Sequence, residues 1–309
     1  MIFLGTAGFA GPSFEALLGS GHDVAALVTQ PDRSRGRDRR QAKAPPLKPI
    51  AQQHGVRVLQ PPRVREAGPI QQLRDLAPDV LAVVAYGQIL PRELIDLASH
   101  GAINVHASLL PRYRGAAPIQ WALANGDATT GVTTMQIDDG LDTGPMLLKR
   151  RLQVGPRETA AELEPRLAQI GAELLLETLA ALEAGTLKPR AQDESEATLA
   201  PRLRKEDGLV DWKRPAEQIE RRMRAFVQWP GSTTSYEGRS LKLLAARSID
   251  GEGDGDTGTV TEIGPDGIVV ACGGETLLRL ERVQPESRRA MPATDFARGA
   301  RLGVGATLG

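Results

Sequence analysis

Cysteine and long apolar runs are almost absent from this 309-residue chain. Cys272 is the single cysteine, so no disulfide can form within the chain, which is typical of a reducing compartment. No stretch reaches the roughly eighteen apolar residues that a membrane span needs. The start, Met1–Gly5, lacks the basic residues and long apolar middle of a signal peptide. We therefore expect a cytoplasmic protein with no membrane-spanning segment.

Net charge is also missing, because 38 basic residues balance 38 acidic ones. A neutral chain has no gross attraction to nucleic acid or membranes, although a local basic patch remains compatible with it. Apolar residues make up 41% of the chain and charged residues 25%, as in ordinary globular proteins. The length predicts two domains. Nothing in the sequence requires more than a monomer.

Short apolar runs alternate with helical stretches over the first half of the chain, which predicts an α/β domain with a mostly parallel sheet. The expected strands are 2–4, 24–28, 56–59, 79–85 and 101–106, followed by 130–137 and 146–154 as a possibly antiparallel pair. The expected helices are 12–18, 46–54, 68–76, 91–99 and 159–184.

The composition changes after residue 187. The segment 188–207 contains two prolines, several charges and no clear period, which is typical of a linker. A helix at 216–226 and glycine-separated strands at 241–246, 258–263, 267–272 and 277–283 then predict a small β-barrel. The expected domains are 1–187 and 208–309.

Only four histidines are available for chemistry. His22, His54 and His100 each lie beside a glycine after a predicted helix, where a histidine favours the negative end of the helix dipole. His106 instead ends a predicted strand. Because ligands of open α/β sheets bind beyond the carboxyl ends of the strands, His106 is the candidate for a functional site.

Asn104 lies two residues before His106, so both side chains are expected on one face of the strand. An amide donor beside an imidazole suits a carbonyl oxygen that gains negative charge. Spacing alone leaves another interpretation open, in which Asn104 satisfies a turn and His106 caps a neighbouring element.

A polar loop supplies the candidate carboxylates Asp138, Asp139 and Asp142. Gly140 and Gly144 would let its backbone approach a ligand closely. Spacing does not choose among the three acids, and a simple turn between two strands explains the loop equally well.

Three motifs resemble those of the formyltransferases that use 10-formyltetrahydrofolate. They are Asn104–Pro111 with its continuation to Ile119, Gly140–Gly144, and Val84–Pro91. The resemblance implies a Rossmann-like N-terminal catalytic domain and Asn104, His106 and Asp142 as catalytic residues, without a metal. It further implies a folate site made of Tyr86, Gly87, Gln88, Ile89, Ser108, Leu109, Leu110 and Pro111.

Further matches resemble the members of this family that formylate methionine carried by initiator tRNA. They are Gln30–Arg33, Asp207–Trp212 and Arg224–Gly231. This likeness implies an oligonucleotide-binding (OB-type) C-terminal barrel in contact with the tRNA.

The stretch 31–48 carries seven basic and two acidic residues, a net charge of +5, and suits binding to phosphates and unpaired bases. A solvated charged loop is its other interpretation. The predicted tRNA contacts are Arg33, Arg35, Arg37, Arg39, Arg40, Lys43, Arg202, Arg204 and Lys205, with Arg37 as the expected reader of the acceptor stem. The alternatives are transfer to a small amine, such as a purine precursor or sugar nucleotide, and a catalytically dead RNA-binding protein.

Overall fold

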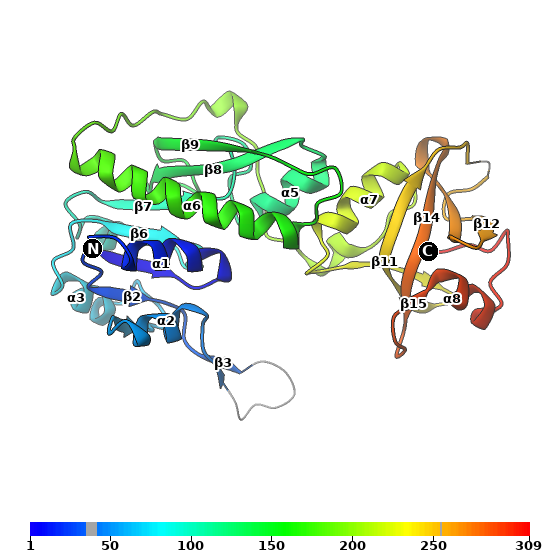
Figure 1. Cartoon of the computed structure of the whole chain (residues 1–309), viewed down its shortest axis with the longest axis horizontal. Helices are drawn as coiled ribbons and strands as arrows, with labels where there is room; N and C mark the ends of the chain where they lie inside the picture. The colour runs from blue at the N-terminus through cyan, green and yellow to red at the C-terminus, as the bar shows by residue number, and fades with distance from the viewer. Residues whose placement is uncertain (35–41, 254) are drawn as a thin grey trace. The chain divides into compact units, whose positions relative to one another are not determined.

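The computed structural model describes residues 1–34, 42–253 and 255–309. The chain folds into two compact units (Figure 1). Unit 1 contains residues 1–115, 129–153 and 164–200, and unit 2 contains residues 116–128, 154–163 and 201–309. The predicted domain boundaries stay a prediction.

Unit 1 is built on a seven-stranded sheet with the order β5-β2-β1-β6-β7-β8-β9. Its strands are β1 (Ile2–Gly5), β2 (Ala26–Val28), β5 (Arg57–Leu59), β6 (Leu81–Val84), β7 (Ala102–His106), β8 (Thr129–Gln136) and β9 (Met146–Gln153). The first five are parallel, and β8 and β9 are antiparallel to their neighbours. The expected α/β architecture with a mostly parallel sheet is confirmed, as is the antiparallel pair.

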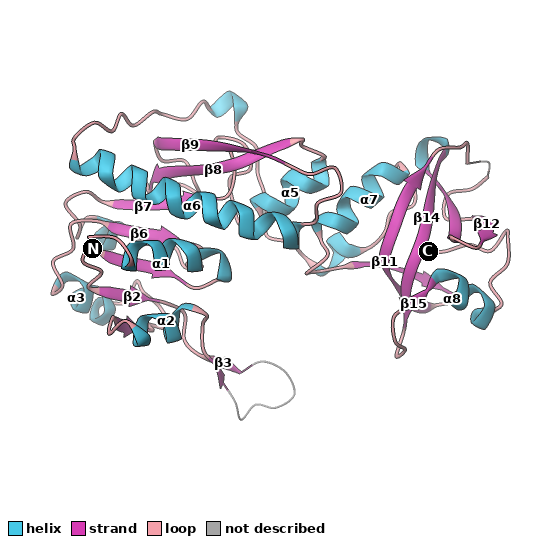
Figure 2. Ribbon diagram, in the orientation of Figure 1, coloured by secondary structure: helices cyan, strands magenta, loops and turns pink. Residues whose placement is uncertain are grey.

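Helices cover both faces of this sheet (Figure 2). They are η1 (Gly8–Ala10), α1 (Gly11–Leu18), α2 (Leu47–Gln53), α3 (Ala67–Arg74), α4 (Arg92–Ile95) and α6 (Ala160–Glu183). Phe3 stacks at 5.0 Å on Phe14 of α1, and a Cβ on Gly171 of α6 would lie 2.9 Å from Val105, so α1 and α6 share one face. Leu73 of α3 and Leu94 of α4 pack against the other face.

The chain reverses direction across the sheet between β1 and β6, because β2 and β5 lie on one side of β1 and β7 on the other side of β6. Ligands of open α/β sheets bind at such a switch point, beyond the carboxyl ends of the strands. The loops after β1, β6 and β7 all begin at this edge. A small hairpin, β3 (Arg33–Ser34) with β4 (Ala42–Lys43), follows β2.

Unit 2 contains an antiparallel sheet with the order β10-β11-β14-β13-β12, and β15 pairs with β14. The strands are β10 (Ser232–Tyr236), β11 (Arg239–Ile249), β12 (Val260–Gly264), β13 (Gly267–Cys272), β14 (Thr276–Pro285) and β15 (Met291–Pro292). The helices of unit 2 are α5 (Pro118–Asn125), α7 (Ala216–Ala225) and α8 (Ala293–Ala300), with the short 3-10 turns η3 (Lys205–Gly208) and η4 (Gly273–Glu275). One further 3-10 turn, η2 (Glu194–Glu196), belongs to unit 1. The antiparallel sheet agrees with the expected OB-type barrel.

Several elements differ from the sequence prediction. Helix α4 covers only Arg92–Ile95 of the expected 91–99, and α5, α8 and β10 were not predicted. Among the described residues, no helix combines the length and apolar character that a membrane crossing requires.

Candidate active site

Asn104 and His106 lie at the carboxyl end of β7. The register aligns Asn104 with Val83 of β6, while Val105 faces α6, so Asn104 and His106 project together from the opposite face. Asn104 is half-buried, and within the described part of the chain its side-chain amide has no hydrogen-bond partner. A half-buried amide without a partner is available to a ligand.

The His106 ring is only 6% exposed and has a neighbour at each nitrogen. Nε2 lies 2.9 Å from the carbonyl oxygen of Tyr113. Because a carbonyl oxygen only accepts hydrogen bonds, Nε2 must carry a proton. Nδ1 lies 3.6 Å from Oδ2 of Asp142. This contact places the Asp142 carboxylate next to the one ring nitrogen that Tyr113 leaves open.

Asp142 is the acid of its loop that faces the histidine. Its Oδ2 accepts a 2.8 Å hydrogen bond from the backbone N–H of Gly115. Asp138 instead accepts bonds from the Gly140 N–H at 3.1 Å and the Thr143 hydroxyl at 2.7 Å, which makes it a turn-forming residue. Asp139 is exposed.

The loop after β7 is anchored to the adjacent strands. His106 pairs across the sheet with Thr133 of β8, and Thr133 pairs with Lys149 of β9. The Thr133 hydroxyl donates to the Ser108 carbonyl at 2.7 Å and accepts from the Leu110 N–H at 3.1 Å. The Lys149 ammonium donates to the Leu110 carbonyl. These bonds occupy the backbone of the predicted folate segment Ser108–Pro111 from the sheet side.

The loop after β6 has an inward and an outward part. Tyr86 is buried in the core, which raises the pKa of its hydroxyl, and its carbonyl accepts from Thr6 Oγ1 at 3.0 Å and Gln30 Nε2 at 3.3 Å. Gly87 and Ile89 are exposed, and the Ile89 side chain is 89% exposed. Gln88 is held by the Val64 N–H, which donates to Oε1 at 2.8 Å. Of the predicted folate residues here, Gly87 and Ile89 are the most open to a ligand.

A segment that the sequence predicted only as part of a linker braces this site. Residues 190–200, called the strap below, run beside the loop that follows the cis Leu110–Pro111 bond. Arg114 exchanges backbone hydrogen bonds with it, donating to the Thr198 carbonyl at 2.8 Å and accepting from the Ala200 N–H at 2.7 Å. The Thr198 hydroxyl accepts from the Tyr113 N–H at 2.9 Å. The strap therefore fixes the carbonyl that binds His106.

Side chains of the strap reach the Asp142 loop as well. Gln192 Nε2 donates to the carbonyls of Asp142 at 2.7 Å and Gly144 at 2.8 Å, and Gln192 Oε1 accepts from Arg114 Nε at 2.9 Å. Arg114 is only 5% exposed and binds both carboxylate oxygens of Glu194. This bidentate hydrogen bond lowers the pKa of the Glu194 carboxyl. Sequence reasoning missed Arg114, Gln192 and Glu194, because no local pattern links residues about eighty positions apart.

The predicted tRNA contacts are only partly described. Arg35, Arg37, Arg39 and Arg40 lie outside the described residues, and Arg33 is described only as backbone in β3. Lys43 is exposed in unit 1, and Arg202, Arg204 and Lys205 are exposed in unit 2.

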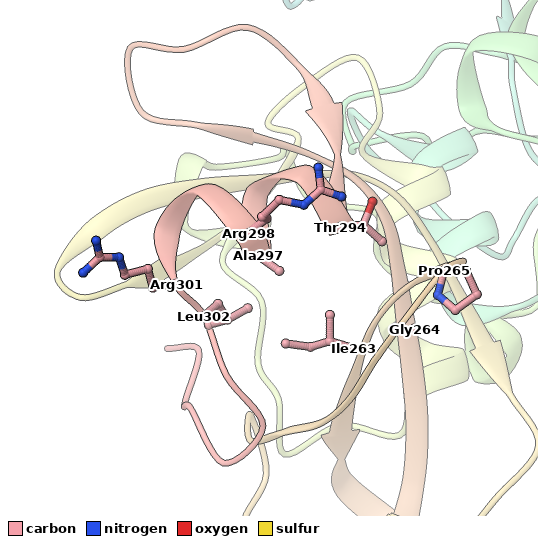
Figure 3. Close-up of a pocket in the computed structure, with 8 residues that line it drawn as sticks. All are labelled: Ile263, Gly264, Pro265, Thr294, Ala297, Arg298, Arg301 and Leu302. Atoms are coloured by element: carbon pink, nitrogen blue, oxygen red, sulfur yellow. The ribbon is translucent and has the colours of Figure 1, made fainter.

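A cavity of about 490 Å³ lies in unit 2 and is lined by none of the predicted site residues. Ile263 and Leu302 border its interior, while Arg298 and Arg301 extend from α8 in different directions (Figure 3). Its lining contains no histidine, carboxylate or amide side chain, whereas the end of β7 brings His106 and Asp142 together.

Comparison with known proteins identifies the family of the chain. The family model described as "Formyl transferase" matches residues 1–179, and that described as "Formyl transferase, C-terminal domain" matches residues 202–301. Methionyl-tRNA formyltransferases from Geobacter metallireducens and Solibacter usitatus are each 50% identical over 309 residues, covering 100% of this chain and 98% of each relative.

Solved structures share the fold at low sequence identity. An N-formyltransferase from Helicobacter canadensis, in complex with folinic acid and dTDP-3-aminofucose, is 16% identical with a TM-score of 0.68 over 92% of this chain and 98% of that one. The methionyl-tRNA formyltransferase from Clostridium thermocellum is 16% identical with a TM-score of 0.55 over 81% of this chain and 94% of that one.

Proposed function

The chain belongs to the formyl transferase family and is a formyltransferase, and from this premise we propose that it moves the formyl group of 10-formyltetrahydrofolate to the α-amine of initiator methionyl-tRNA. The product is N-formylmethionyl-tRNA for translation initiation in the cytoplasm. The observation that carries the proposal is the cluster at the end of β7, where a free amide of Asn104 lies beside the His106–Asp142 pair.

The proposed catalytic roles follow from the hydrogen-bonding groups of Asn104 and His106 that remain available to the substrate. The Asn104 amide N–H donates to the formyl oxygen as the amine adds to the formyl carbon and that oxygen gains negative charge. His106 has already given its Nε2–H to Tyr113, so only its Nδ1 side is left, and that side faces Asp142. A protonated Nδ1 would give the developing oxyanion a second donor.

The His106–Asp142 pair is proposed to move the protons that the reaction requires. The C–N bond between the amine and the formyl carbon forms, and the bond from that carbon to N10 of the folate breaks. The attacking amine loses one proton and N10 gains one, so no net proton is consumed. The His106–Asp142 pair, in which Nδ1 lies 3.6 Å from Oδ2, takes up the proton from the amine and delivers one to N10.

The folate donor fits the edge of the sheet at the switch point. Exposed Gly87 and Ile89 offer a free backbone and an apolar side chain to a flat ring. A mostly apolar surface with a few fixed polar groups is typical of small-molecule sites. Each unit offers exposed cationic side chains that suit tRNA phosphates, Lys43 in unit 1 and, separately, Arg202, Arg204 and Lys205 in unit 2.

The test is formyl transfer from 10-formyltetrahydrofolate to three acceptors: methionyl initiator tRNA, methionyl elongator tRNA, and a sugar nucleotide that carries a free amine. We expect formylmethionine on the initiator tRNA and little or none on the other two. Transfer to the sugar nucleotide alone would assign the chain to a small-amine formyltransferase, and no transfer to any acceptor would contradict the proposed function.

A further inference from the structure

The strap residue Gln192 makes three hydrogen bonds that converge on the backbone around Asp142. Its Nε2 donates to the Asp142 and Gly144 carbonyls, at 2.7 and 2.8 Å. Its Oε1 accepts from Arg114 Nε, at 2.9 Å. Because a guanidinium only donates and a carbonyl only accepts, no other orientation of the amide satisfies all three partners.

The conformation of Asp142 explains why such a brace is needed. Its φ of 54° lies in the left-handed region, which costs free energy in a residue with a Cβ. Strained backbone persists only where the surroundings determine it. Here the carbonyl of Asp142 is bound by Gln192 and its carboxylate by the Gly115 N–H. The two contacts fix the main chain and side chain of the same residue.

Arg114 completes the arrangement by holding Gln192. It is almost fully buried, and its remaining nitrogens bind Glu194 at 2.8 and 2.7 Å. Gly115, which follows Arg114 directly, supplies the N–H that Asp142 accepts. The consecutive residues Arg114 and Gly115 thus hold both groups. The Arg114 side chain orients Gln192, and the Gly115 backbone N–H orients the Asp142 carboxylate.

We propose that Gln192, oriented by Arg114, is a positioning residue that holds the Asp142 carboxylate against Nδ1 of His106 for formyl transfer. The inference rests on the proposed function for its kinetic consequence, although the brace itself can be measured without substrate. Gln192 does not reach the reacting atoms in this account and acts only through Asp142.

The variant that tests this is Gln192→Glu, which keeps the size of the side chain. A carboxylate still pairs with Arg114 but presents an acceptor to the two carbonyls that Gln192 binds as a donor. We expect kcat to fall on the order of 100-fold, because a displacement of about 1 Å at a catalytic group has that cost, while KM for the folate stays within about twofold. The matched control is Gln72→Glu, an exposed glutamine on α3 in the same unit, which should keep wild-type kinetics.

Two further measurements separate positioning from a general loss of structure. In an Asp142→Asn background, Gln192→Glu should lower kcat no further, since residues acting as a unit are not additive. Hydrogen exchange at the Gly115 amide, measured without substrate, should speed up by about tenfold or more in Gln192→Glu and stay unchanged in Gln72→Glu, because that amide is protected by Asp142.

Unchanged kcat in Gln192→Glu, full additivity with Asp142→Asn, or unchanged exchange at Gly115 would each overturn the proposal. A wild-type protein that formylates none of the acceptors would refute the proposed function instead. In that case faster exchange at Gly115 would still support the brace on Asp142.

Discussion

At the scale of single residues, His106 is held at both ring nitrogens by groups from two different loops. Tyr113 binds Nε2, and Asp142 lies at Nδ1. The ring is therefore fixed in orientation, and the side that faces Asp142 is left for proton transfer. The side-chain amide of Asn104, on the same strand, has no hydrogen-bond partner among the described residues. In the proposed mechanism, Asn104 stabilises the negative charge on the formyl oxygen, and the His106–Asp142 pair moves the protons.

Asp142→Asn removes the proton-accepting oxygen while keeping the shape, and asparagine tolerates a positive φ well. We expect kcat to fall by at least about 100-fold at every pH tested, with folate affinity retained. Steady-state kinetics across pH, together with equilibrium titration of folate, measure both quantities. Asp139→Asn, three residues away and exposed, is the control and should behave as wild type. Comparable turnover in the two variants would remove Asp142 from the mechanism.

Cys272 is buried in unit 2, and burial raises the pKa of its thiol to about 12. With a pKa of about 12, only about one ten-thousandth of the Cys272 thiol is the reactive thiolate near pH 8. A free cysteine, with a pKa near 8.5, holds a far larger thiolate fraction at that pH. We expect an aromatic disulfide reagent to modify Cys272 only as fast as unit 2 opens. Rapid labelling of the native protein at the rate of a free thiol would show that the site is not buried.

The sequence predicts part of this site by physics and part only by resemblance. Two side chains at positions i and i+2 of a strand share a face, so Asn104 and His106 could be paired from spacing alone. Choosing Asp142 among three acids required the family motif. Gln192 and Arg114 are 78 positions apart, and neither periodicity nor charge pattern reveals a contact of that separation.

At the scale of elements, helix α6 and strand β7 pack so closely at Gly171 that no larger side chain fits there without a shift. A Cβ on Gly171 would lie 2.9 Å from Val105, between Asn104 and His106. Gly171→Ala gains helix propensity of up to about 1 kcal/mol but overpacks the core, which costs about 1–3 kcal/mol. We expect a net loss of unfolding free energy in denaturant titration, together with reduced turnover.

Gly68→Ala on α3 is the matched control for this substitution. No heavy atom lies within 4 Å of its added Cβ, so it gains propensity without a clash. Its unfolding free energy should rise or stay unchanged. If Gly171→Ala stabilised the protein as Gly68→Ala does, the close packing at Gly171 would be refuted.

Most strands and helices with alternating or periodic apolar residues were predicted, whereas β10, α5 and α8 were missed for different reasons. Strand β10 buries Ser232 and Thr234, and the indole N–H of Trp212 donates to the Thr234 hydroxyl at 3.1 Å. A polar strand of this kind carries no hydrophobic signal. Helix α5 did carry signals, Pro118 in its first turn and Gly126 at φ 80° after its last.

At the scale of the whole molecule, a neutral chain must bind a polyanion through local charge. If Arg202, Arg204 and Lys205 contact phosphates, log K for tRNA should fall by about 0.7–0.9 per contact for each tenfold rise in salt. Replacing any one of them with alanine removes one contact and should therefore reduce that slope by about 0.7–0.9. Filter binding across a salt series measures it, with Lys188→Ala, exposed and outside the predicted contacts, as control. A flat salt response would contradict a backbone-tracking interface.

The central claim is that the end of β7 carries out formyl transfer, and a single-turnover experiment tests it most directly. Enzyme in excess over 10-formyltetrahydrofolate labelled in the formyl group is mixed with methionyl initiator tRNA, for the wild type, for Asn104→Ala, and for Asn125→Ala, the other asparagine of the chain. The account predicts labelled formylmethionine from the wild type and Asn125→Ala. It predicts a rate lower by about 100- to 1,000-fold in Asn104→Ala, the cost of removing one oxyanion donor. Equal rates in all three proteins, or no label on methionine in the wild type, would contradict it.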